Sequence, residues 1–176
     1  MPDARHANLL EPEALVELFL RHPPQGFAAA SEADLPVFGT DFDLLTTLEP
    51  AILVKIRRLP LFGLWSRLLR FPARFAGTTA TEYAPLPKGL EPGALLDGFR
   101  ERCAAGQSLL IVKDVPEVSP LLGAGDNEAA MRLARIAPDK GFIVVEGQAL
   151  AYVPIDFSST DEYLSRLSKS RRKNLR

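Results

Sequence analysis

Residues 108–114 read SLLIVKD, and this stretch decides the expected fold. Four consecutive large apolar residues followed by a charged pair predict a β-strand that is covered on both faces, at the centre of a sheet. The chain on either side predicts helices over residues 90–105 and 127–137, because apolar residues recur there at helical spacing and Gly106 is a stop signal. A strand between two helices indicates a layered α/β domain.

Further from this strand, strands and helices continue to alternate. Branched apolar residues predict strands at four more places, and a three-to-four spacing predicts a first helix and a short one starting near Leu61. The predicted strands cover residues 51–57, 75–85 (with Gly77 at a bulge), 142–145 and 150–155, and the first helix covers residues 12–22. The alternation predicts an α/β or α+β sandwich.

The last segment carries a capping box, Ser159-Thr160-Asp161-Glu162. In this motif the Ser hydroxyl and the Glu carboxylate each satisfy an open N–H of the first helical turn. We expect one helix from Thr160 to the end of the sequence, and neither Gly nor Pro terminates it. We therefore expect the chain to be the N-terminal part of a longer product.

The charge is nearly balanced overall but strongly segregated. The chain has 21 Lys and Arg against 22 Asp and Glu. Six cations and no acid lie within residues 51–81, and the same is true of residues 166–176, which leaves nine cations and a net charge of −13 elsewhere. The first basic island comprises Lys55, Arg57, Arg58, Arg67, Arg70 and Arg74, and the second comprises Arg166, Lys169, Arg171, Arg172, Lys173 and Arg176.

Each island has several interpretations. The second could contact nucleic-acid phosphates, bind an acyl or phosphate ligand, or be a solvated helix surface, although its lack of acids argues against the last. The first includes aromatic residues, namely Phe62, Trp65, Phe71 and Phe75. Pro60, Gly63 and Pro72 interrupt it, so packing of these aromatics in a core is favoured over binding at a membrane surface. Its cations would then line one side of the domain and attract an anionic ligand.

Several classes of site are disfavoured. Cys103 is the single cysteine, which excludes a disulfide framework and a thiolate zinc site, and its place on an apolar helix face predicts burial. With only His6 and His22 available, no metal site or Ser-His-Asp triad is expected. The N-terminus does not resemble a signal peptide and no apolar run reaches 18 residues, so we expect a cytoplasmic protein without a transmembrane segment. The near-neutral charge argues against DNA as the partner.

Three short motifs have both a functional and a structural interpretation. Asp41-Phe42-Asp43 matches a metal-binding Asp-x-Asp, but a polar loop leading into an element is favoured. Gly123-Ala124-Gly125 is a weak candidate for a phosphate loop, and a flexible loop is favoured because the Lys-Ser/Thr of a P-loop is missing. Lys113-Asp114 ends the 108–114 strand, where α/β proteins often place functional groups, but surface ions are favoured.

Two stretches nevertheless resemble a family. The run LLIVKDVP at residues 109–116, and above all the pattern F-S-S-x-x-E-Y-L-x-x-L-S-x-x-x-R-x-N-L-R at residues 157–176, resemble bacterial acyltransferases of the GNAT type. The similar proteins are those of the FemAB-like and CelD (BioF2-like) class. The resemblance is most specific over residues 108–176.

The resemblance implies a mixed, largely antiparallel sheet flanked by helices. It divides the chain into a GNAT-like N-terminal domain, residues 1–157, and the linker and opening helix of a second GNAT-like half, residues 158–176, whose remainder is missing. It implies transfer of an acyl or aminoacyl group to a small-molecule amine, possible roles in cell-envelope or peptidoglycan biosynthesis, and acetyl-CoA or another acyl-CoA as donor. Alone, the chain is expected to be inactive.

One family motif is absent and limits what can be transferred. No Arg/Gln-x-x-Gly-x-Gly/Ala loop, which binds the pyrophosphate of CoA, occurs in the chain. No catalytic residue and no metal ligand is assigned. Arg171, Arg172 and Arg176 match the motif and could contact an anionic substrate or donor or hold the two halves together. The expected anion-binding residues are these three and Lys169, with a secondary basic patch of Arg57, Arg58, Arg67, Arg70 and Arg74.

Two other functions remain open. One is a non-catalytic, degenerate GNAT-like module that binds an anionic partner. The other, weaker, is a protein that binds peripherally to a membrane surface.

Overall fold

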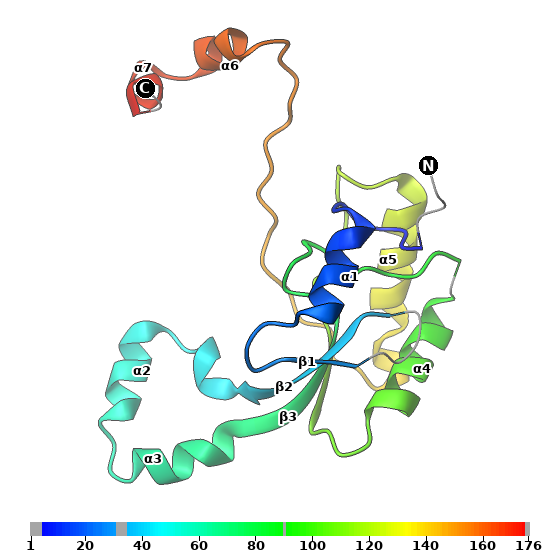
Figure 1. The fold of residues 1–176 in the computed structure, drawn as a ribbon, viewed down its shortest axis with the longest axis vertical. Coiled ribbons are helices and arrows are strands. Elements are labelled where there is room, and N and C mark those ends of the chain that lie inside the picture. Colours follow the sequence, from blue (N-terminus) through cyan, green and yellow to red (C-terminus); the bar gives the residue numbers. More distant parts are fainter. Residues whose placement is uncertain (1–4, 31–34, 90, 175–176) are drawn as a thin grey trace.

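The computed structural model describes residues 5–30, 35–89 and 91–174 and contains one four-stranded sheet (Figure 1). The strands β1 (Ala28–Ala30), β2 (Val37–Asp43), β3 (Arg70–Ala76) and β4 (Leu109–Val112) lie side by side in that order. The β1–β2 and β2–β3 pairs are antiparallel, and the β3–β4 pair is parallel. The predicted mixed, largely antiparallel sheet with flanking helices is confirmed.

Helices cover both faces of the sheet. Side chains alternate between the faces of a strand, so the neighbours Val37 and Phe38 point to opposite sides. Phe38 meets Phe19 of helix α1 (Glu13–Arg21) in an edge-to-face contact with ring centroids 4.6 Å apart. Val37 belongs instead to the main buried cluster, with residues of α4 (Pro92–Cys103) and α5 (Ala124–Ile136). The protein core therefore has a layer on each side of β2.

The predicted helix over 90–105 is confirmed as α4. Its carboxylate cap is Glu91, which accepts hydrogen bonds from the backbone N–H groups of Gly93 at 2.7 Å and Ala94 at 3.2 Å. Cys103 is buried on its apolar face, as expected. Helix α5 begins at Ala124, with Gly123 in the cap position. The expected flexible Gly-Ala-Gly loop is therefore wrong, because two of its residues form the first helical turn.

The chain between β2 and β3 differs from the prediction. Residues 51–57 do not form a strand but lie in helix α2 (Pro50–Arg57), which is followed by α3 (Phe62–Trp65) and η2 (Ser66–Leu69). Branched residues favour strands only when a neighbouring strand is available, whereas Pro50 at the first turn and cations at the last turn favour a helix locally. The short helix near Leu61 is confirmed.

Two predictions about β3 and β4 are also wrong. Strand β3 starts at Arg70, includes Pro72 and stops at Ala76, so most of the strand predicted over 75–85 is a loop that begins at Gly77, whose φ is +121°. Strand β4 is the last strand of the described sheet, and its four residues are half-buried rather than central and covered.

The segment after α5 contains no strand. Residues 142–145 and 150–155, both predicted as strands, are extended without a described sheet partner, and Ile143 and Ile155 are 89% and 83% exposed. Hydrophobic strand composition is insufficient here, because a strand also requires a neighbour to which its backbone groups can bond.

Two short helices end the described chain and lie apart from the sheet (Figure 1). Ser159 caps α6 (Thr160–Arg166) by accepting a bond from the N–H of Glu162 at 3.2 Å, as predicted. The Glu162 carboxylate, however, accepts from Ser158 rather than from Ser159. Leu167 is extended, with φ −79° and ψ 148°, so the expected continuous helix is interrupted before α7 (Lys169–Asn174).

Candidate functional site

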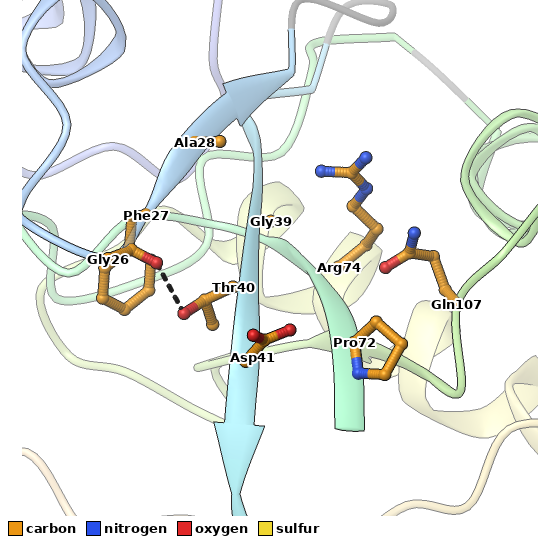
Figure 2. Close-up of a pocket in the computed structure, with 9 residues that line it drawn as sticks. All are labelled: Gly26, Phe27, Ala28, Gly39, Thr40, Asp41, Pro72, Arg74 and Gln107. Atoms are coloured by element: carbon orange, nitrogen blue, oxygen red, sulfur yellow. Dashed lines mark hydrogen bonds between the residues drawn. The ribbon is translucent and has the colours of Figure 1, made fainter. Parts of the chain in front are cut away.

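A hollow of about 370 Å³ opens on the sheet beside the middle of β2 and β3 and the start of β1 (Figure 2). Its polar side chains on one face of the sheet are those of Asp41 on β2, Arg74 on β3, and Gln107 in the connection from α4 to β4, and Thr40, the neighbour of Asp41, lines it from the strand β2. Figure 2 shows the carboxamide of Gln107 on the same side as Arg74. The hollow therefore combines a guanidinium, a carboxylate and an amide on one face of the sheet.

The strand register explains why these residues meet. Gly39 pairs with Arg74 and Asp41 pairs with Pro72 across the β2–β3 ladder, so all four lie on one face of the sheet. The same face carries Val37, which packs under α4 and α5. Helix α4 ends at Cys103, and beyond it this face is open.

Glycine at position 39 makes room for the arginine. A Cβ atom at Gly39 would lie 1.9 Å from Nη1 of Arg74, closer than any two such atoms can approach. The backbone of β2 therefore serves as a wall against which the guanidinium lies. Since Arg74 is half-buried, its charge is less screened by water than that of the exposed arginines of the same island.

The two opposite charges of the hollow do not neutralise each other. No ion pair joins Arg74 or Asp41 to any residue that the structure describes, and Figure 2 shows the guanidinium pointing away from the Asp41 carboxylate. At the far end of the same strand, Arg70 does pair with Asp43, with Nε and Oδ2 3.4 Å apart. The Thr40 hydroxyl donates to the Gly26 carbonyl at 2.8 Å. The hollow thus offers one unpaired cation and one unpaired anion to a ligand.

The predicted secondary basic patch is distributed over several elements. Arg74 lines the hollow, and Arg70 pairs with Asp43. Arg57, Arg58 and Arg67 are exposed on the helical connection between β2 and β3, which projects from the end of the sheet (Figure 1). The aromatics Phe62 and Trp65 of this connection pack against each other at 5.3 Å between ring centroids, not in the core as expected.

The second island is not part of the hollow. Lys169, Arg171 and Arg172 are exposed on α7, which lies away from the sheet (Figure 1). Arg166 on α6 pairs with Asp156 at 2.7 Å and with Glu162 at 2.5 Å. Arg176 lies outside the described residues. The structure therefore does not bring the predicted anion-binding residues of the two islands together.

The Asp-x-Asp motif has two separate roles. Asp41 faces the hollow, whereas Asp43 accepts a bond from the N–H of Leu45 at 2.9 Å and pairs with Arg70. The motif lies in β2 rather than in the expected polar loop. Within the described part of the chain, no cluster of three or more His, Cys, Asp or Glu side chains is placed to hold a metal ion.

The charged pair after β4 is satisfied locally. Lys113 pairs with the adjacent Asp114 and donates to the Thr78 carbonyl at 3.2 Å. This arrangement ties the end of β4 to the loop that follows β3, and it accounts for the pair without a ligand.

Sequence reasoning did not select Asp41, Thr40 or Gln107 as partners of Arg74. Gln107 carries no motif, and its position depends on where α4 ends. In the sequence, Asp41 is distinguished only as part of Asp-x-Asp. The alternation of residues 37–43 indicates which side chains share a face of the strand. Which residues of β3 lie opposite them depends on the strand register, and the sequence alone does not supply it.

Comparison with known proteins yields no match among family models, curated proteins or solved structures. None of the helices in the described ranges is long and apolar enough to cross a bilayer.

Proposed function

We propose that this chain supplies the acceptor-binding surface of a GNAT-type N-acyltransferase, and that the acceptor is a small amine that also carries a carboxylate. The observation that carries the proposal is the pair of unpaired, opposite charges, Arg74 and Asp41, in one hollow. The mixed sheet with flanking helices and the motif at residues 157–176 support the transferase class.

The residue types fit such a ligand. The planar guanidinium of Arg74 can donate two parallel hydrogen bonds to a carboxylate, and the Gln107 amide can supply a further donor. The Asp41 carboxylate attracts an ammonium group. A ligand with only one of these charges would leave the other protein charge without a partner, so the hollow selects for both groups.

In the proposed transfer, the amine nitrogen bonds to the acyl carbonyl carbon and loses a proton, while the carbon–sulfur bond of the thioester breaks and releases the thiol. The hollow would act by holding the acceptor in position. The donor, acetyl-CoA or another acyl-CoA, would bind outside it, because the pyrophosphate-binding motif is absent from this sequence. A role in cell-envelope or peptidoglycan biosynthesis, carried out in the cytoplasm, forms part of this proposal.

The test is a titration of the 15N-labelled protein with unbranched amino carboxylates of increasing length: glycine, β-alanine, 4-aminobutyrate and 6-aminohexanoate. We expect amide shifts at the hollow, and one length that binds best because the spacing of Arg74 and Asp41 is set by the strands. Butyrate and butylamine should bind at least about tenfold more weakly than 4-aminobutyrate if both charges are read. Equal binding of all these compounds, or shifts elsewhere, would reject the proposed acceptor class.

A second candidate is the non-catalytic module for an anionic partner. The observation that favours it is Arg74 without Asp41: a half-buried guanidinium that no described residue neutralises. Titration with butyrate and 4-aminobutyrate distinguishes the two. Butyrate that binds as tightly as 4-aminobutyrate would favour the module, because only the charge of Arg74 would then be recognised.

A further inference from the structure

The connection between β2 and β3 projects from the end of the sheet and is defined here as the basic arm, residues 44–69 (Figure 1). The base of the arm is closed where Asp43 and Arg70, the last paired residues of the ladder, form their ion pair at 3.4 Å. Helices α2 and α3 and the turn η2 contain no buried residue. The arm is therefore anchored on the sheet at its base, where Leu45 is 8% exposed, but its helices α2 and α3 and the turn η2 do not contribute to the core.

The arm turns large aliphatic side chains toward water. Leu61, Leu64 and Leu68 are 74%, 68% and 76% exposed. Leu64 lies in α3 and Leu68 in η2, and Leu61 is the cap residue that immediately precedes α3. Ile52, Val54 and Leu59 are also exposed. Six large aliphatic side chains exposed within one short segment indicate a binding surface for a partner or a membrane.

The arm has four cations and a single acid, Glu49, which lies at its start. Lys55, Arg57, Arg58 and Arg67 are exposed, and no described residue forms an ion pair with them. No Asp or Glu occurs between Pro50 and Thr81 in the sequence. The side chains that surround the exposed leucines are thus complementary to a negatively charged surface.

We propose that the basic arm docks on the surface of a bilayer that contains anionic lipid. Aliphatic side chains gain free energy by entering the boundary between headgroups and acyl chains, while Lys and Arg remain at the headgroups. Nucleic acid would use the cations but would leave the leucines in water. The bilayer is the partner that accounts for both sets of residues.

Trp65 fits the same location. It is half-buried against Phe62, and its indole N–H donates to the Pro60 carbonyl at 3.1 Å. Trp is favoured at membrane interfaces because its ring is apolar and its edge is polar. Since it is the single Trp of the chain, its fluorescence reports on the arm alone.

The test uses the intact chain with vesicles of phosphatidylcholine, with and without phosphatidylserine, followed by co-sedimentation and Trp65 fluorescence. We expect binding that requires phosphatidylserine, weakens with salt and shifts the emission to shorter wavelength. Changing Leu61, Leu64 and Leu68 together to Ser should reduce binding at least about tenfold. Val118→Ser, at a side chain that is 71% exposed and outside the arm, is the matched control and should bind like the original protein.

A charge test separates the two islands. Arg57→Glu with Arg58→Glu should weaken binding about tenfold or more, whereas Arg171→Glu with Arg172→Glu on α7 should change it less than about threefold. Circular dichroism and thermal melting show whether each variant is folded. If the triple leucine variant is not folded, the single variant Leu61→Ser replaces it in the binding test.

Three results would overturn the proposal. They are absence of binding to phosphatidylserine vesicles, equal binding to phosphatidylcholine alone, and unchanged binding of the leucine variants. Binding to single-stranded DNA that competes with vesicles and does not depend on the leucines would instead identify a polyanion site.

Discussion

The two basic islands carry the same number of cations but lie in different structural settings. The first begins in the arm and ends on β3, where Arg74 lies in a hollow between strands. The second lies on α6 and α7, apart from the sheet, with its described residues exposed (Figure 1). Arg166 of this island forms ion pairs with Asp156 and Glu162.

The difference shows that charge density alone does not make a ligand site. Arg74 is distinguished by the missing Cβ of Gly39, the unpaired carboxylate of Asp41 and the end of α4, all supplied by distant parts of the chain. The second island has the family-like motif but no comparable surroundings. The first island is thus the better candidate for recognition of a small molecule.

The largest expected effect is on stability, and it compares the core that packs on the sheet of the first island with helix α6 of the second. Changing Phe99, which is 2% exposed in α4, to Ala should lower the free energy of unfolding by about 3–5 kcal/mol, because a cavity remains in the core. Leu164→Ala, at a half-buried position in α6, should cost less than about 1 kcal/mol. Urea denaturation measures both. Similar losses would show that α6 is packed as part of the same cooperative core.

A smaller effect is expected from filling the space beside Arg74. In Gly39→Ala, the new Cβ must displace the guanidinium, so 4-aminobutyrate should bind about tenfold more weakly, with a stability loss of about 1–3 kcal/mol. Gly63→Ala in the arm is the matched control, because no atom lies within 4 Å of its added Cβ. Calorimetry gives the affinity. Unchanged binding in Gly39→Ala would remove Gly39 from the site.

Charge reversal on the second island should have almost no effect on the hollow. Arg171→Glu with Arg172→Glu should leave the affinity for 4-aminobutyrate within about twofold, since the dissolved ions screen exposed charges on α7 from the hollow. Titration at physiological ionic strength measures this. A large loss would mean that the two islands share one site.

The smallest effect is a local pH dependence of α6. Bonds from the Ser158 backbone N–H, the Ser158 hydroxyl and Arg166 lower the pKa of Glu162 below its ordinary value of 4.5. A lowered carboxyl pKa stabilises the helix above that ordinary value, and the contribution is lost as the pH falls through the lower, folded-state pKa. Amide signals of α6 should therefore shift toward coil at acidic pH before those of the sheet, and Glu162→Gln should abolish this step. Simultaneous loss of all signals would contradict it.

The parts of the fold that were predicted correctly are those encoded by local signals. Helix α4 has its cap, apolar face and Gly106 stop within one short segment, and α1 and the short helix near Leu61 are similar cases. The strands predicted at 51–57, 142–145 and 150–155 failed because strand formation depends on a neighbour that composition does not reveal. The edge position of β4 was missed for the same reason.

The candidate site was only partly predictable. Arg74 was selected for its charge within the first island, not for its surroundings. The register of β2 on β3 decides that Gly39 pairs with Arg74 and Asp41 with Pro72, and the sequence does not reveal it. Gln107 lies at the hollow because helix α4 ends four residues before it. The resemblance pointed to Lys169, Arg171, Arg172 and Arg176, and their part in binding stays a prediction.

The comparison of Arg74 with Arg70 gives the most direct test of the central claim. Both arginines lie on β3, but Arg70 has Asp43 as a partner and Arg74 has none among the described residues. Calorimetric titration of 4-aminobutyrate should show that Arg74→Ala weakens binding at least about tenfold, while Arg70→Ala leaves it within about twofold. Equal affinity of the Arg74→Ala variant and the original protein would contradict the account.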